Sequence, residues 1–163
     1  MQDWLKKLTC YNLLFTLPIY LNKSAGNETV FEHFGNSSLT AVFLITGDYE
    51  QMITWPEAFC KEPVEKVLKV IRFDNRDTGL YTQFHVSPEP DLTVSMAGDF
   101  LSVAYTLSDM AADTVGLMDA LGFDTENLVG ASMVSMIDQA MAIKYPARLK
   151  SVTSTIATTG IIS

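Results

Sequence analysis

Residues 127–134 read Asn-Leu-Val-Gly-Ala-Ser-Met-Val, a short apolar strand that leads into a turn of small residues around Ser132. A predicted helix over residues 133–145 follows at once and ends before Pro146, because proline cannot continue a helix. A tight turn between a strand and a helix lifts a serine hydroxyl clear of the sheet. The start of the helix offers backbone N–H groups and a positive dipole end to an oxyanion. The segment therefore predicts a strand, a sharp turn at Ser132 with the layout of a nucleophile turn, and a helix.

Strand-like and helix-like segments alternate along the rest of the sequence. The predicted strands cover residues 29–34, 41–45, 67–73, 127–129 and 151–156. The run 41–45 is apolar throughout, which suits a strand that is covered on both faces. Strands separated by helices predict βαβ crossovers, and therefore an α/β fold with a mainly parallel sheet and helices on both faces.

Three of the turns that follow predicted strands hold the candidate functional residues. These turns begin at Gly47, Asp74 and Ser132. In sheets of this kind ligands bind beyond the carboxyl ends of the strands. We therefore expect the three turns to gather on one edge of the sheet.

Two helices have clear signals at their ends. Pro56 begins the first helix, and we expect Pro63 to break or end it. The second helix has apolar residues at helical spacing over residues 107–121. Thr106 is placed to cap this helix with Asp109 three residues on, and Gly122 is expected to end it.

The composition excludes several classes of protein. Of the 163 residues, 48% are hydrophobic and 18% are charged, which excludes an intrinsically disordered chain and suits one domain with a sizeable core. The net charge of −8 gives no general reason to bind nucleic acid or an anionic membrane. Cys10 and Cys60 cannot form a disulfide framework, and the usual zinc spacings are absent. We expect no metal, no cofactor and a cytoplasmic location.

The N-terminal stretch allows an alternative to a cytoplasmic location. Lys6 and Lys7 precede an apolar run over residues 8–21, as in a signal peptide, although Asp3 weakens the basic region. The run is too short and too interrupted for a membrane span, so membrane association is not favoured. We predict a leader or extra packing segment over residues 1–28, with export or membrane association through residues 1–22 as the alternative. The remaining residues, 29–163, form the predicted domain.

Five blocks of sequence, in order, carry a resemblance to a known family. They are residues 51–56 (QMITWP), 71–80 (IRFDNRDTGL), 105–122 (YTLSDMAADTVGLMDALG), 129–133 (VGASM) and 145–149 (YPARL). With these blocks, residues 30–160 resemble the N-terminal half of the core domain of the α/β-hydrolase superfamily. The similarity is greatest to the bacterial esterase group that includes aclacinomycin methylesterase.

The resemblance implies a role for each residue of the turns. Ser132 would be the nucleophile, and Gly130 would be the first glycine of the nucleophile elbow. The backbone N–H groups of Met133 and of Asp48, which follows Gly47, would form the oxyanion hole. The substrate would be a small-molecule ester, and the family needs no cofactor for this reaction. From the residues alone, Ser132 can also be a helix N-cap serine and Gly47-Asp48 an ordinary turn.

Several residues depart from the pattern of the family. Val134 and Ser135 replace two glycines, and a β-branched side chain at such a turn adapts poorly to unusual backbone angles. Asp138 replaces a small apolar residue, which puts a carboxylate against the sheet, where it is costly unless paired. Thr46 stands where many members have His. Tyr81 replaces Ser in a loop, where we expect little effect.

The sequence after Ser132 lacks the partners of the nucleophile. In this family the triad acid and then the histidine follow the serine. Asp138 is the one carboxylate after Ser132 and lies within the next helix, while His33 and His85 both precede Ser132. We therefore expect an N-terminal portion of a serine esterase that is inactive alone. The alternative is a non-catalytic remnant that acts as a binding or partner-dependent domain and self-associates through an exposed sheet edge. A serine at this position does not by itself separate esterase from perhydrolase chemistry.

Overall fold

A computed structural model describes residues 19–22, 27–36, 39–47, 50–81, 104–132 and 135–156 of the chain. The strands in these residues are β1 (Ile19–Asn22), β2 (Asn27–Phe34), β3 (Ala41–Ile45), β4 (Lys69–Phe73), β5 (Glu126–Ala131) and β6 (Leu149–Thr155). The α-helices are α2 (Glu57–Glu65), α4 (Leu107–Ala120) and α5 (Ser135–Lys144), and two short 3₁₀ helices are η1 (Met52–Thr54) and η3 (Pro146–Arg148).

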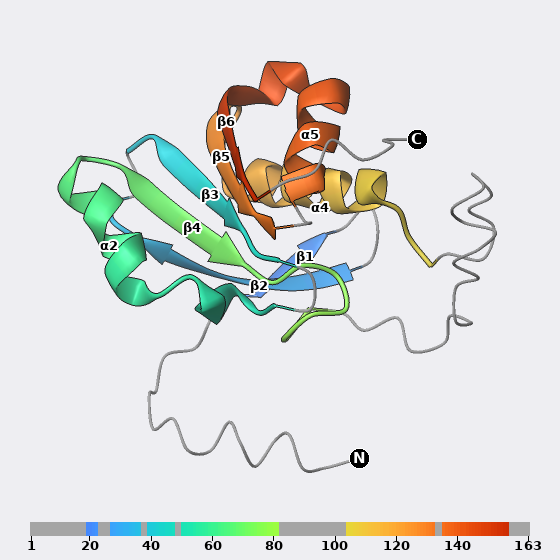
Figure 1. Ribbon diagram of the computed structural model, residues 1–163, viewed down its shortest axis with the longest axis horizontal. Coiled ribbons are helices and arrows are strands. Elements are labelled where there is room, and N and C mark those ends of the chain that lie inside the picture. Colours follow the sequence, from blue (N-terminus) through green and yellow to red (C-terminus); the bar gives the residue numbers. More distant parts are fainter. Residues whose placement is uncertain are drawn as a thin grey trace, which may run out of the picture.

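The strands form one sheet in the order β1-β2-β4-β3-β5-β6 (Figure 1). β2 pairs antiparallel with β1 and β4, whereas the β4–β3, β3–β5 and β5–β6 pairs are parallel. All five residues of β3 are buried, as expected for a strand in the middle of a covered sheet. The prediction of a mainly parallel sheet is confirmed.

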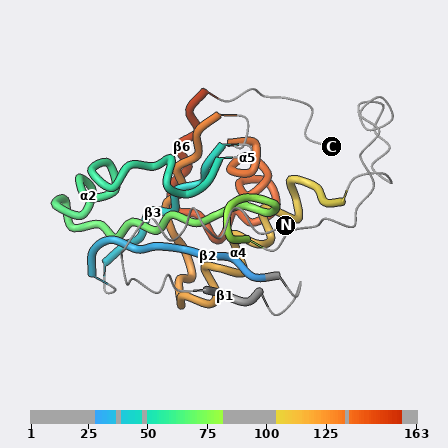
Figure 2. The backbone as a smooth tube through the Cα atoms, turned by 90° about the horizontal axis from the view of Figure 1, so that it is seen from below, coloured from blue at the N-terminus to red at the C-terminus, as the bar shows by residue number. Residues whose placement is uncertain are grey.

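Helices cover both faces of the sheet, which is also as predicted. Because side chains alternate along a strand, Phe43 and Ile45 pack with residues of α4 and α5, while Val42 and Leu44 pack with Cys60 of α2. In both views α2 lies apart from α4 and α5, and these two helices lie side by side (Figures 1 and 2). The chain thus forms a three-layer α/β arrangement.

Pro63 does not end α2 where we expected. The helix continues through Pro63 and ends at Glu65. Because Pro63 lies in the last turn, the missing N–H removes one helical hydrogen bond and leaves the preceding turns intact. The chain leaves the helix at Val67, which has a left-handed backbone with φ 66°. The prediction of a helix here is confirmed, but the prediction that Pro63 breaks or ends it is wrong.

The ends of α4 agree with their sequence signals. The Thr106 side chain accepts a hydrogen bond from the Asp109 N–H at 3.3 Å, and Asp109 Oδ2 accepts one from the Thr106 N–H at 2.7 Å. This is the reciprocal capping box that the sequence predicts. Gly122 follows the helix with φ 76°, a backbone conformation that glycine adopts without strain.

The sheet begins inside the range that we interpreted as a leader. β1 lies within residues 1–28 and pairs with β2 in the register Ile19 to Val30. Residues 1–18 lie outside the described residues, so the signal-peptide alternative stays a prediction. None of the helices in the described part of the chain is long and apolar enough to cross a membrane.

Candidate active site

The three turns do meet at one edge of the sheet. Ile45, the last residue of β3, is in register with Gly130 of β5, so the turns that follow these strands adjoin. The turn after β4 joins them because the Asn75 side-chain amide donates a hydrogen bond to the Thr46 carbonyl at 3.0 Å. Asn75 and Thr46 are both buried, so this bond fixes the chain just before Gly47.

Ser132 has an unusual backbone conformation. Its φ is 72°, in the left-handed region, although it is not a glycine. Such a residue stores about 1–3 kcal/mol of strain and persists where the surrounding structure holds it. The Ser135 hydroxyl, in the first turn of α5, donates a hydrogen bond to the Ser132 carbonyl at 2.6 Å. An ordinary N-cap residue has an extended backbone, so the geometry of Ser132 differs from that of a simple N-cap serine.

Gly47 lies directly beside Ser132. A Cβ atom built on Gly47 would lie 3.5 Å from the Cβ of Ser132 and 2.6 Å from Oε2 of Glu50. A side chain at position 47 would therefore occupy space that Glu50 fills, next to the serine. Asp48, Met133 and Val134 lie outside the described residues, so the oxyanion-hole roles and the effect of Val134 stay predictions.

A cleft of about 280 Å³ opens next to these turns. Its lining is mostly apolar and consists of Thr46, Gly47, Glu50, Thr54, Trp55, Pro56, Phe59 and Ala131. Among the residues that the structure describes, the buried atoms Thr46 Oγ1 and Trp55 Nε1 have no hydrogen-bond partner. The volume is close to the lower end of the range for small-molecule sites. The cleft can hold the apolar part of a ligand beside Ala131 and Gly47.

Asp74 holds the turn after β4 in place. Its two carboxylate oxygens accept hydrogen bonds from the Met52 N–H at 2.7 Å and from the Leu80 N–H at 3.0 Å. Burial raises the pKa of Asp74, and these two hydrogen bonds act in the opposite direction. Gly79 has φ 55°, and a Cβ there would lie 2.6 Å from Asp74 Cγ, so this turn requires a glycine.

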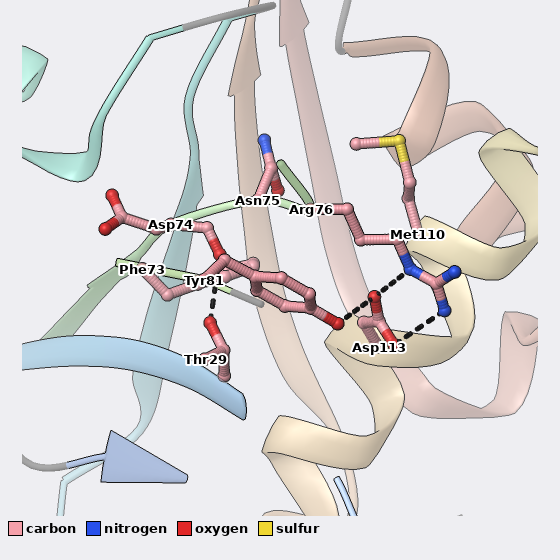
Figure 3. A pocket seen from close by; sticks show the side chains of 8 residues that line it. All are labelled: Thr29, Phe73, Asp74, Asn75, Arg76, Tyr81, Met110 and Asp113. Carbon is pink, nitrogen blue, oxygen red and sulfur yellow. Dashed lines mark hydrogen bonds and ion pairs between the residues drawn. The ribbon is translucent and has the colours of Figure 1, made fainter. Parts of the chain in front are cut away.

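A buried polar cluster then ties this turn to α4 (Figure 3). Arg76 forms an ion pair with Asp113 of α4, and the Tyr81 hydroxyl donates a hydrogen bond to the same carboxylate at 2.6 Å. The enclosed space is about 10 Å³, enough for roughly one water molecule and too small for a substrate. Tyr81 is 4% exposed and bonds to a residue 32 positions away, so it is part of the packed structure; that its replacement of Ser has little effect stays a prediction.

Asp138 lies against the sheet, as the sequence predicts, and is fully buried. Its Oδ2 accepts a hydrogen bond from the Ser154 hydroxyl of β6 at 3.1 Å, while Oδ1 has no partner among the described residues. Burial raises the pKa of Asp138 to about 7, although the hydrogen bond from Ser154 acts to lower it. A Cβ on Gly130 would lie 2.7 Å from Asp138 Cγ and closer still to Oδ2. Because Gly130 has no side chain, it leaves room for the Asp138 carboxyl group.

We expect Gly130→Ala to destabilise the protein by about 1–3 kcal/mol, because the added methyl group overlaps the Asp138 carboxyl in a closely packed layer. Urea unfolding followed by circular dichroism measures this loss. In an Asp138→Ala background the same glycine substitution should cost much less, since the carboxyl is gone. An equal cost of Gly130→Ala in both backgrounds would show that the two positions do not compete for space.

The structure brings no described histidine to Ser132. His33 is exposed on β2, which β4 and β3 separate from β5, and His85 lies outside the described residues. Within the described ranges, no group of three or more His, Cys, Asp and Glu side chains could hold a metal ion. The site thus consists of a strained serine, a neighbouring glycine turn and an apolar cleft.

Comparison with solved structures shows which fold this arrangement of strands and helices has. A carboxylesterase of the thaumarchaeon Nitrososphaera gargenis superposes with a TM-score of 0.70 at 16% identity, over 86% of this chain and 46% of that one. A thermophilic esterase of Thermogutta terrifontis gives a TM-score of 0.67 at 24% identity, over 88% of this chain and 46% of that one. The chain therefore has the α/β-hydrolase fold and corresponds to about the N-terminal half of it.

Two relatives found by sequence comparison are methylesterases. The chain is 29% identical over 122 residues to rhodomycin D methylesterase DnrP of Streptomyces peucetius, and 27% identical over 122 residues to rhodomycin D methylesterase DauP of Streptomyces sp. strain C5. Each match covers 75% of this chain and 36% of the relative, so the chain spans about a third of the length of these relatives. No protein-family model matches the chain.

Proposed function

We propose that this chain carries the nucleophile portion of a serine carboxyl-ester hydrolase, with Ser132 as the nucleophile. The observation that carries the proposal is the left-handed backbone of Ser132, φ 72°, in a turn that adjoins Gly47. A serine held in this way projects from the carboxyl edge of the sheet, where substrates of α/β folds bind. The methylesterase relatives support an ester as the substrate class.

The reaction would proceed by acyl transfer. Ser132 Oγ attacks the ester carbonyl carbon, and the N–H groups of Met133 and Asp48 stabilise the oxyanion of the tetrahedral intermediate. The alcohol then leaves with a proton, and water hydrolyses the acyl-enzyme to release the acid and restore the serine hydroxyl. The cleft beside Ala131 and Gly47 would receive an apolar part of the substrate.

None of the described residues provides a general base for Ser132. A serine without an adjacent base is a weak nucleophile. No histidine follows Ser132, and the matched relatives are nearly three times as long as the matched segment. We propose that the triad acid and histidine belong to sequence outside these 163 residues, and we expect this chain alone to react slowly.

A binding or partner-dependent domain is the second candidate. The observation that favours it is the exposed edge of the sheet, since residues 150–155 of β6 are all exposed and β6 pairs on one side with β5. An unpaired strand edge can accept a strand from a second copy or another protein. Such a domain would need no reactive serine, so the reactivity of Ser132 distinguishes the two candidates.

Labelling with a fluorophosphonate probe tests the proposed nucleophile. We expect a slow adduct on Ser132, located by peptide mass spectrometry, because the strained turn presents the hydroxyl to an electrophile. Ser132→Ala should remove the adduct. Ser151→Ala, which changes an exposed serine on β6, should leave it unchanged.

A second variant makes a negative result informative. Ser132→Cys should react with iodoacetamide if position 132 is accessible, whatever the reactivity of the native serine. An alkylated Cys variant together with an unlabelled native Ser132 would overturn the proposed nucleophile and favour the binding domain. Equal labelling of several serines would count against it as well.

A further inference from the structure

Asp138 is a buried carboxyl group that the proposed reaction does not use. It lies in α5 with no exposed surface and contacts the sheet at Gly130 of β5 and Ser154 of β6. The Ser154 hydroxyl is its one hydrogen-bond partner among the described residues, and Oδ1 is unpaired. A buried carboxylate normally has several donors or a cation, so this site suits a neutral acid better than a charged one.

The charged groups that the structure describes around α5 do not stabilise an ionised Asp138. The helices and strands packed against α5 are α4, β5, β6 and η3. Their charged residues are Asp109, Asp113, Asp119, Glu126, Arg148 and Lys150. Lys144 is on α5 itself and is exposed. Arg148 pairs with Asp119 and Lys150 with Glu126, so both cations are engaged away from Asp138.

The same helix holds the serine turn at a second point. Ser135, one turn before Asp138, donates its hydroxyl hydrogen to the Ser132 carbonyl at 2.6 Å. Gly130, which Asp138 contacts, lies two residues before Ser132 on the strand side of the turn. Any movement of this end of α5 away from β5 therefore acts on both flanks of Ser132. A residue with φ 72° depends on such support from its surroundings.

We propose that Asp138 is a positioning residue for the serine turn. As a neutral acid it packs α5 against β5 and β6, and its ionisation weakens this packing and thereby loosens the backbone around Ser132. The neutral acid can exchange a hydrogen bond with Ser154 in either direction, because a hydroxyl both donates and accepts. The carboxylate can accept but not donate, and its negative charge has no counter-ion among the described residues.

The consequence for reactivity rests on the proposed function. Reaction of a serine ordinarily increases with pH as its base loses a proton. In this protein, the loss of the Asp138 proton would act in the opposite direction and lower the reactivity of Ser132 above neutral pH. Burial raises the pKa of Asp138 to about 7, which places this change close to neutral pH.

Nuclear magnetic resonance of the full chain tests the coupling without any activity. The Asp138 side-chain carboxyl and the backbone amides of Gly130 and Ser132 are followed between about pH 5 and about pH 9, well above the ordinary aspartate pKa. We expect the three signals to titrate together with a midpoint of about 7. Asp138→Asn should abolish the changes at both amides, and Asp124→Asn, which removes a carboxyl at an exposed position, should not.

The results separate the coupling from the proposed function. The proposal is overturned if the Asp138 carboxyl is already ionised throughout this range, or if it titrates while the two amides stay constant. Titration of the wild-type chain decides these outcomes even if Asp138→Asn does not fold. If the shared titration is found and Ser132 takes no fluorophosphonate adduct, the positioning role holds and the esterase proposal fails. If Ser132 takes the adduct without shared titration, the positioning role fails and the esterase proposal holds.

Discussion

The free energy of unfolding is expected to fall by on the order of 4 kcal/mol as the pH rises from about 4 to about 8. The cause is Asp138, whose pKa burial raises from 3.8 to about 7 in the folded state. Between these values the unfolded chain has released this proton and the folded chain still holds it, so folding is linked to proton uptake. The contribution is complete below the unfolded pKa and is lost as the pH rises through about 7. Urea unfolding at a series of pH values measures it.

Asp138→Asn is the matched control for this prediction. The amide keeps the size of the side chain and cannot ionise, so most of the decline in stability with rising pH should disappear. A smaller decline should remain, because burial also raises the pKa of Asp74 and this shift has the same sign. Asp109 has an effect of the opposite sign. Burial acts to raise its pKa, but hydrogen bonds from Thr106 lower the pKa below its ordinary value. The stability that Asp109 contributes is therefore lost as the pH falls. Parallel curves for the wild type and Asp138→Asn would contradict the assignment to Asp138.

Arg76→Met is expected to cost about 3–5 kcal/mol of folding free energy, because it removes one partner of a buried ion pair and leaves the other charged. Arg76 and Asp113 are both largely buried, and Asp113 also accepts the hydrogen bond from Tyr81 (Figure 3). Methionine fills much of the arginine volume, so the loss reports mainly on charge. Urea unfolding at a single neutral pH measures the change relative to the wild type.

Two further variants calibrate this result. Tyr81→Phe removes a single hydrogen bond to a charged group and should cost about 1.5–3 kcal/mol, less than the loss of the arginine. Lys61→Met breaks the exposed pair between Lys61 and Glu57 in α2, where solvent screens the charges, and should change stability little. If Arg76→Met costs no more than Lys61→Met, the buried pair does not support the turn after β4.

Local patterns in the sequence were enough for much of the fold. The apolar run 41–45, the capping box of Thr106 and Asp109, and Gly122 each act through neighbours in the chain, and each is found where the sequence predicts it. The order of strands and helices also predicted that the turns at Gly47, Asp74 and Ser132 share an edge, because parallel strands place their carboxyl ends together. These features need no knowledge of long-range contacts.

The roles of Tyr81, Asp138 and Gly130 became clear only from the tertiary structure. Tyr81 reaches a carboxylate on α4, and Asp138 fills the space over Gly130 while it bonds to β6. The strain at Ser132 likewise depends on how α5 meets β5. Composition and spacing describe each side chain with its neighbours along the chain. Burial, hydrogen bonding and therefore the charge state of a side chain depend on partners that only packing brings together.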